Sequence, residues 1–294
     1  MKEHVPLSRY TTLGTGGPAR WFDTPDTEQA LVERLAWAAS EGVAVAVVGL
    51  GSNLLVADDG FPGLVLKLGG ELAKAEAAER RLVAGGGAPL AVCLHRARAA
   101  ELGELEFACA IPGTVGGGVW MNAGAYGSDI AQVLDRALVA EAGGARWLTP
   151  AELGLRYRSS GLRHGQVVAR AEFRLEPRPA DEIKATVSEM QARRKAAQPS
   201  NKRTFGSVFK NPEHELTAGR MLEACGLRGF RLGGAQISPK HANFIENADG
   251  ARSADAIALV AEARRRAREK FGIELHPEVQ LLGALEVPPL EMSS

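Results

Sequence analysis

One glycine-rich stretch limits the folds open to this chain more than any other segment. Ile111–Gly127, IPGTVGGGVWMNAGAYG, holds six glycines in seventeen positions. Glycine loses more backbone entropy on folding than any other residue, so a fixed run of this kind needs a reason. The glycines either form tight turns within the protein or bring the backbone against a ligand, and the segment alone does not decide.

A second glycine turn lies about 60 residues earlier, in VVGLGSNLLV, Val47–Val56. A predicted strand runs there into Gly-Leu-Gly-Ser-Asn, whose backbone N–H groups, hydroxyl and amide suit the oxygens of a diphosphate. No third glycine opens a helix, which excludes the Rossmann fingerprint, and GTVGGGVW lacks the lysine of a Walker loop. The two turns fit two sides of one extended diphosphate ligand, or they are two unrelated turns.

Composition narrows the class of partner. The 294 residues include 35 basic and 35 acidic residues, and this balance argues against a nucleic acid or an anionic membrane. No apolar run approaches the roughly 20 residues of a membrane span, and the N-terminus lacks the core of a signal peptide. Scattered cysteines and histidines predict neither disulfides nor a metal site. We therefore expect a cytoplasmic protein without metal.

Hydrophobic periodicity predicts an α+β N-terminal part. We expect a helix over Thr27–Glu41 with Asp26 as its N-cap, and another over Pro89–Leu102. Strands are expected in VAVAVVGLG, GLVLKL, RRLVAGGG and VVARAEFRLEP, with a hairpin that turns at Gly143–Gly144.

A smaller α/β part follows the linker Pro177–Pro179. A long helix is expected over Asp181–Gln198, then two helices that end at Gly226 and Gly272. The basic cluster Ala263–Lys270 is expected on a solvated helix face. Strand candidates lie at Gly234–Ile237, Asn243–Glu246 and Val279–Leu282.

Three later stretches carry reactive side chains. In YRSSG, Arg158 beside hydroxyls can clamp a carboxylate, or is a surface arginine. In TFGSVFKNP, Ser207 lies between two phenylalanines, where a supported hydroxyl can donate a proton; no spacing of serine, histidine and aspartate indicates a hydrolase. In LHPEVQLLG, Glu278 follows Pro277 in a predicted strand, and among apolar neighbours its carboxyl must be paired or protonated, unless it is simply exposed.

In their order along the chain, these motifs resemble the UDP-N-acetylenolpyruvoylglucosamine reductase family. The succession TTLGTGGPA, GLGSNLLV, IPGTVGGGVWMNAGAYG, YRSSGL, QPSNKRTFGSVFKNP, GAQISPKHANFIEN and HPEVQLLG runs from Thr11 to Gly283. The resemblance implies an α+β fold: a vanillyl-alcohol-oxidase/PCMH-type FAD-binding domain of two α+β subdomains, plus a smaller C-terminal α/β substrate-binding domain. The expected boundaries are 1–65, 66–178 and 179–285, with a tail at 286–294.

The resemblance also implies a reaction. The family reduces the enolpyruvyl group of UDP-N-acetylglucosamine enolpyruvate with NADPH, giving UDP-N-acetylmuramate for peptidoglycan precursors. Hydride passes from N5 of FAD to carbon C3, and Ser207 protonates C2. Arg158 stabilises the negative charge that develops on the substrate carboxylate, which Glu278 also contacts. We expect a monomer and, since no histidine lies near GLGSN, non-covalent FAD.

Binding residues are carried over motif by motif. The expected FAD contacts come from the two glycine-rich stretches, with Gly118 assigned to packing: Gly49, Leu50, Gly51, Ser52, Asn53, Leu54, Pro112, Gly113, Thr114, Gly116, Gly117, Asn122, Ala123 and Gly124. The expected substrate contacts are Asn211, His241 and Arg203. Only 49 positions separate Arg158 from Ser207, with no tyrosine between them, which resembles the branch of the family without a substrate-capping tyrosine loop.

Two other functions remain as alternatives. One is an FAD oxidase or dehydrogenase of the same fold that acts on a sugar or hydroxy acid; an oxidase, however, needs no proton donor to carbon. The other is a nucleotide-sugar sensor without turnover, which the complete set of catalytic motifs disfavours.

Overall fold

The computed structural model describes residues 1–289 and divides into two compact units. The first comprises Met1–Glu3, Trp21–Leu50 and Gly63–Arg194; the second comprises His4–Arg20, Gly51–Pro62 and the chain from Lys195 onward. One boundary falls between Leu50 and Gly51, inside the predicted FAD-binding stretch. The predicted domain boundaries at residues 65 and 178 stay a prediction.

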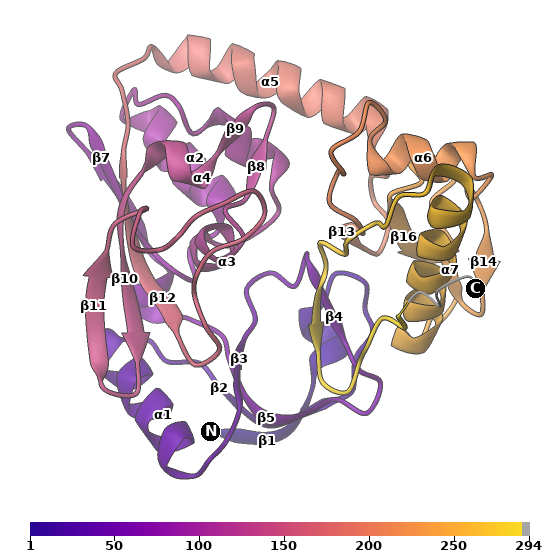
Figure 1. The fold of residues 1–294 in the computed structure, drawn as a ribbon. Helices are drawn as coiled ribbons and strands as arrows, with labels where there is room; N and C mark the ends of the chain where they lie inside the picture. Colours follow the sequence, from indigo (N-terminus) through magenta and orange to yellow (C-terminus); the bar gives the residue numbers. More distant parts are fainter. Residues whose placement is uncertain (290–294) are drawn as a thin grey trace. The chain divides into compact units, whose positions relative to one another are not determined.

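A five-stranded antiparallel sheet forms the centre of the first unit (Figure 1). Its order is β11-β10-β12-β7-β6, with bounds β6(Ala75–Ala78), β7(Arg81–Gly85), β10(Leu134–Glu141), β11(Gly144–Leu148) and β12(Val167–Arg174). Both faces are covered. Ala137 and Val139 of β10 face the core that includes α2(Leu90–Ala99), whereas Leu138 and Ala140 face the core that includes α1(Glu28–Ser40). The period of two along a strand explains this alternation.

Shorter elements lie outside this sheet; several of them contain residues of both units, and the 3-10 turn Leu7–Tyr10 belongs to the second unit. A four-stranded sheet has the order β1-β2-β5-β3, and β3(Val45–Val47) pairs in parallel with β5(Phe61–Leu66). The remaining elements are β1(Lys2–Pro6), β2(Pro18–Asp23), α3(Val115–Trp120), β8(Gly124–Ala125), β9(Ser128–Asp129), α4(Ile130–Val133) and α5(Ala180–Ala197), with 3-10 turns at Leu7–Tyr10, Gly70–Ala73 and Glu106–Ala110.

Two helices pack on a four-stranded sheet in the second unit. The strand order is β13-β16-β15-β14, with bounds β13(Thr204–Ser207), β14(Arg231–Leu232), β15(Ala235–Ile237) and β16(Phe244–Asn247). α6(Ala218–Ala224) and α7(Ser253–Phe271) bury their apolar faces in one core with Phe205, Ile237 and Ile245. β17(Gln280–Leu282) returns to pair in parallel with β4(Leu54–Val56).

Most predicted elements are confirmed, and three details are wrong. The N-cap of α1 is Thr27 instead of Asp26, because the Thr27 side chain accepts the Ala30 N–H at 3.2 Å. The hairpin turns one residue earlier than Gly143–Gly144, since Glu141 pairs with Gly144. Arg264 is buried instead of solvated, and it donates to the Glu274 carboxylate and the Leu275 carbonyl.

Other expectations concern ends and absences. Gly226 and Gly272 have the left-handed conformation expected after α6 and α7. The predicted tail at 286–294 extends past the described residues. Within residues 1–289, no helix has the length and apolar character that crossing a bilayer requires, and no group of acidic, cysteine and histidine side chains could hold a metal.

Candidate active site

Gly51 of the predicted FAD loop is held in place by Tyr10 and Thr12 of the second unit. Gly51 has a φ of +67°, and a Cβ there would lie 1.9 Å from the Tyr10 carbonyl oxygen, so only glycine fits. The backbone N–H of Thr12 donates to the Gly51 carbonyl at 3.0 Å, while the Thr12 hydroxyl donates to the Thr204 carbonyl at 2.6 Å. The start of the motif TTLGTGGPA therefore fixes the conformation at Gly51.

Ser207 and Glu278 come together through backbone hydrogen bonds. The Glu278 N–H donates to the carbonyl of Val208, the residue after Ser207, at 2.8 Å. The Asn53 side chain donates to the Glu278 carbonyl at 3.1 Å, and the Gln280 N–H donates to the Asn53 carbonyl at 3.0 Å. Two predicted catalytic residues and one predicted FAD contact thus share one strand-end cluster.

The chain around Ser207 leaves regular sheet geometry. Ser207 pairs with Phe244 across β13 and β16, and the register shifts between Thr204 and Ser207. Gly206 inside this irregularity has a φ of +82°. A β-bulge of this kind re-aims the side chain next to it. Beyond the bulge, the buried Asn243 side chain accepts the Phe209 N–H and donates to the Phe209 carbonyl, each at 2.9 Å. These bonds hold the backbone that follows β13.

Arg158 lies in a tight turn of the first unit. Arg156 and Ser159 exchange backbone hydrogen bonds across this turn, and Arg158 has a φ of +53°. Its guanidinium donates to the Gly124 carbonyl at 2.7 Å and lies over the Tyr157 ring at 5.0 Å. A left-handed arginine is uncommon, and such strain persists only where the surroundings impose it.

Asn122 supplies that constraint. It is 3 % exposed, and its side-chain amide donates to the Arg156 carbonyl at 3.1 Å and to the Asp129 carboxylate at 3.3 Å. Its carbonyl oxygen accepts the Ala131 N–H at 2.9 Å. These bonds join NAGAYG to the turn of Arg158, a positioning role that the sequence did not reveal; a direct Asn122 contact with FAD stays a prediction.

The glycines of Ile111–Gly127 differ in what surrounds them. Gly118 is buried, and a Cβ there would meet Leu90 and Ile130, which confirms its assignment to packing. Gly117 is exposed, and a Cβ there would have only the Thr114 hydroxyl oxygen near it, at 3.7 Å. Open space beside Gly117 leaves its backbone accessible, as a ligand that lies against it would need.

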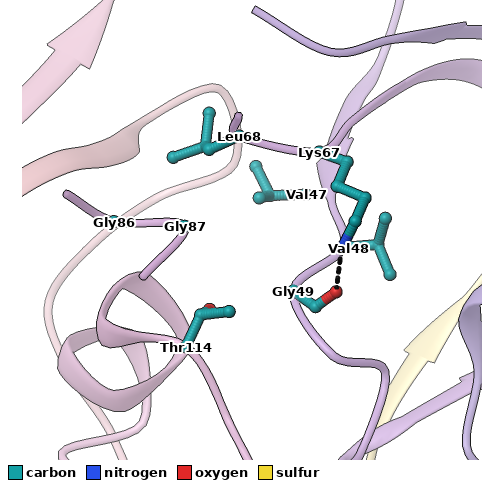
Figure 2. A pocket seen from close by; sticks show the side chains of 8 residues that line it. All are labelled: Val47, Val48, Gly49, Lys67, Leu68, Gly86, Gly87 and Thr114. Atoms are coloured by element: carbon teal, nitrogen blue, oxygen red, sulfur yellow. Dashed lines mark hydrogen bonds between the residues drawn. The ribbon is translucent and has the colours of Figure 1, made fainter. Parts of the chain in front are cut away.

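A small cavity in the first unit lies between Gly49 of the GLGSN stretch and Thr114 of the Ile111–Gly127 stretch. Its walls are Val47–Gly49, Lys67–Leu68, Gly86–Gly87 and Thr114 (Figure 2). Gly49 is required here, since a Cβ would lie 2.5 Å from the Thr114 hydroxyl oxygen. Glycine backbone, one hydroxyl and one ammonium are suitable groups for a phosphate. These residues fit one phosphoryl oxygen of the FAD diphosphate.

A much larger cavity, of about 380 Å³, lies in the second unit. Thr217, Gly219, Arg220, Arg228, Lys240 and His241 line it, together with Glu223. Glu223 pairs with Arg228 at 3.0 Å and with Arg220 at 3.4 Å. Three cations face one carboxylate, so the cavity carries excess positive charge. Arg220, Arg228 and Lys240 escaped sequence reasoning because they are spread along the chain without a run or motif.

Of the predicted substrate contacts, the structure places His241 in this cavity. Its Nδ1 accepts the Asn243 N–H at 3.2 Å, its ring packs against Phe244 at 5.0 Å, and burial lowers its pKa. Because Nδ1 is the acceptor, neutral His241 keeps Nε2–H as a donor.

The other two predicted substrate contacts lie outside the lining of this cavity. The Asn211 side chain accepts the Ala218 N–H at 3.1 Å, at the start of α6. Arg203 is exposed and lies against Gly14.

Comparison with known proteins identifies the family. The family profile for the C-terminal domain of UDP-N-acetylenolpyruvoylglucosamine reductase matches residues 198–282, and the FAD binding domain profile matches residues 19–147. A reductase of this name from Bacillus thuringiensis is 41% identical over 95% of this chain and 93% of its own. The chain belongs to the UDP-N-acetylenolpyruvoylglucosamine reductase family. It therefore contains an FAD binding domain, as expected.

Two further relatives agree with this assignment. The UDP-N-acetylenolpyruvoylglucosamine reductase of Anaeromyxobacter dehalogenans is 43% identical over 99% of this chain and 88% of its own. The crystal structure of the reductase from Thermus caldophilus superposes with a TM-score of 0.83 at 37% identity, covering 96% of this chain and 98% of the other. The predicted fold class is confirmed: an α+β FAD-binding part followed by the family's C-terminal domain.

Proposed function

We propose that this chain reduces the enolpyruvyl group of UDP-N-acetylglucosamine enolpyruvate to the lactyl ether of UDP-N-acetylmuramate, with NADPH as the electron source. The observation that carries the proposal is the cluster of Ser207, Glu278 and Asn53 in a chain of this family. The backbone there brings a residue with a hydroxyl side chain and one with a carboxyl side chain next to Asn53 of the predicted flavin loop. That is the donor set for adding a proton to carbon while a neighbouring carboxylate is held.

The three catalytic residues divide the work. FAD, when bound, would supply the hydride chemistry at carbon C3 of the enolpyruvyl group, with NADPH as the hydride source. Arg158 stabilises the negative charge that this addition places on the substrate carboxylate. Glu278, protonated, donates a hydrogen bond to the same carboxylate, and the Ser207 hydroxyl gives its proton to C2. The left-handed turn and the Gly124 bond of Arg158 support a fixed direction for its charge.

The sugar nucleotide is proposed to place its diphosphate in the cavity of the second unit. Arg228 and Lys240 supply positive charge, and His241 supplies an N–H donor. A volume of about 380 Å³ is in the range of small-molecule sites. Asn211 and Arg203 are proposed to contact the substrate from outside this cavity lining.

Anaerobic mixing in two stages tests the reaction. NADPH should bleach the yellow protein, and UDP-N-acetylglucosamine enolpyruvate should then restore the colour and yield one UDP-N-acetylmuramate per flavin. Bleaching without recovery by the substrate would refute the reaction and leave FAD binding intact. Recovery by a hydroxy acid's oxidation product instead of the sugar nucleotide would favour the alternative dehydrogenase.

A further inference from the structure

Lys67 lies at the carboxyl end of a parallel strand pair in the first unit. β3 and β5 pair with Val47 opposite Leu66, so Gly49 and Lys67 follow the ends of adjacent strands. The Lys67 ammonium donates to the Gly49 carbonyl at 2.9 Å, and Figure 2 shows the side chain reaching across to it. This carbonyl belongs to the first glycine of Gly-Leu-Gly-Ser-Asn.

The charge of Lys67 is not compensated by the protein. The side chain is half-buried, and burial lowers the pKa of its ammonium with no carboxylate acting against that effect. No ion pair among residues 1–289 involves Lys67. An ammonium has three donors, and the Gly49 carbonyl occupies one of them. Partial removal of a lysine from water without a carboxylate partner has a cost, which an anion bound at this site would offset.

The cavity beside Lys67 limits the size of that anion's buried part. Its accessible volume is about 10 Å³, which is close to the space of one water molecule. An oxygen fits there, whereas an aromatic ring does not. Thr114 adds a hydroxyl on the opposite wall (Figure 2). Its oxygen accepts the Gly117 N–H at a long 3.5 Å, and no residue in the described range receives its hydrogen.

We propose that Lys67, with the Thr114 hydroxyl, holds a phosphoryl oxygen of the FAD diphosphate and so makes the flavin site favour a flavin that carries phosphate over riboflavin. Lys67 keeps the Gly49 carbonyl turned toward its strand while its two remaining donors meet the phosphate. The flavin site then gains a point charge at the middle of the cofactor, away from the reacting ring. Riboflavin, which lacks phosphate, gains nothing from it.

The test compares flavin affinities of three full-length variants. FAD release from the holoenzyme and rebinding of FAD or riboflavin after flavin removal are followed by flavin fluorescence at several salt concentrations. Lys67→Met should weaken FAD about 10- to 100-fold, the range of one charge-assisted contact, and leave riboflavin unchanged. Its FAD affinity should also depend less on salt. Lys67→Arg keeps the charge but not the compact ammonium, so its FAD affinity should fall less than that of Lys67→Met.

Lys74→Met is the matched control, because Lys74 is an exposed lysine of the same unit. It should leave both affinities unchanged. An FAD affinity of Lys67→Met within about threefold of the native value would overturn the proposal. So would an equal loss of FAD and riboflavin, which indicates that Lys67 only shapes the glycine loop. If Lys67→Met does not fold, the salt dependence of the native protein is measured instead. Its affinity for FAD must then fall with salt more steeply than its affinity for riboflavin.

Discussion

Arg158 in the first unit and Ser207 in the second are held by different means. Arg158 depends on side chains: a left-handed turn kept in place by the Asn122 amide and by a bond to the Gly124 carbonyl. Ser207 depends on backbone: a strand paired with β16 and bonded to the chain before β17. One side chain, Asn122, holds much of the Arg158 turn, whereas many backbone bonds share the task of holding Ser207. A single substitution should therefore disturb the position of Arg158 more than that of Ser207.

The two cavities also differ in how far the protein itself compensates the positive charge in their walls. In the second unit, Glu223 already pairs with Arg220 and Arg228, so the cationic wall is partly compensated before any ligand binds. In the first unit, Lys67 has only a carbonyl partner among the described residues. Losing a charge should therefore affect cofactor binding in one unit and substrate binding in the other.

The largest effect is expected from Ser207→Ala. It removes the proposed proton donor without disturbing the sheet, because the backbone makes the strand contacts. Recovery of flavin colour with the enolpyruvyl substrate should slow about 100- to 10,000-fold, while bleaching by NADPH keeps its rate. Stopped-flow absorbance measures both stages. Equal slowing of the two would count against the proton-donor role.

Asn122→Ala should be the most damaging change to the Arg158 turn. It leaves the part-buried Ala131 N–H without its acceptor and releases Arg156, at a cost of about 1–3 kcal/mol in the free energy of unfolding. Denaturant melts give this loss. In the folded variant, the colour-recovery stage should slow more than bleaching by NADPH, because the Arg158 guanidinium is no longer held in one direction. Asn243→Ala is the matching variant in the second unit, because it removes the side-chain bonds to the Phe209 backbone that follows β13.

Arg228→Met tests the cavity of the second unit. We expect the KM for the sugar nucleotide to rise about tenfold with FAD affinity unchanged, because one cation of the wall is lost. Steady-state kinetics measures the first and flavin fluorescence the second. Arg231→Met removes an exposed arginine outside the cavity and serves as control. A tenfold rise in KM with both variants would indicate an effect of overall positive charge and would contradict a specific role for this cavity wall.

The smallest effect concerns pH. Burial lowers the pKa of folded His241, so below the ordinary value of about 6.5 the unfolded chain binds more protons than the folded one. His241 thus makes stability fall as pH drops from about 7 toward its folded pKa, and it contributes no further change below that. Comparing denaturant melts of native protein and His241→Asn across this window isolates the contribution. Identical pH slopes would contradict it.

Sequence reasoning predicted the elements well because their signals are local. The helix α7 ends at Gly272 as its pattern indicates, and the Gly118 assignment followed from the apolar residues after it. Finer details were decided by competition between neighbours. Thr27 caps α1 because its hydroxyl reaches Ala30, although the adjacent Asp26 is an equally good capping residue by type.

The order of motifs by itself determined the family, the cofactor and the three residues proposed for the chemistry, since each motif is short and contiguous. Only the tertiary structure showed that Glu278 bonds to the strand of Ser207, that Asn122 holds the turn of Arg158, and that Lys67 reaches Gly49. It also gathered Arg220, Arg228 and Lys240 around one cavity. Side chains far apart in sequence carry no pattern that predicts their meeting, because their proximity depends on strand pairing and helix packing across the whole unit.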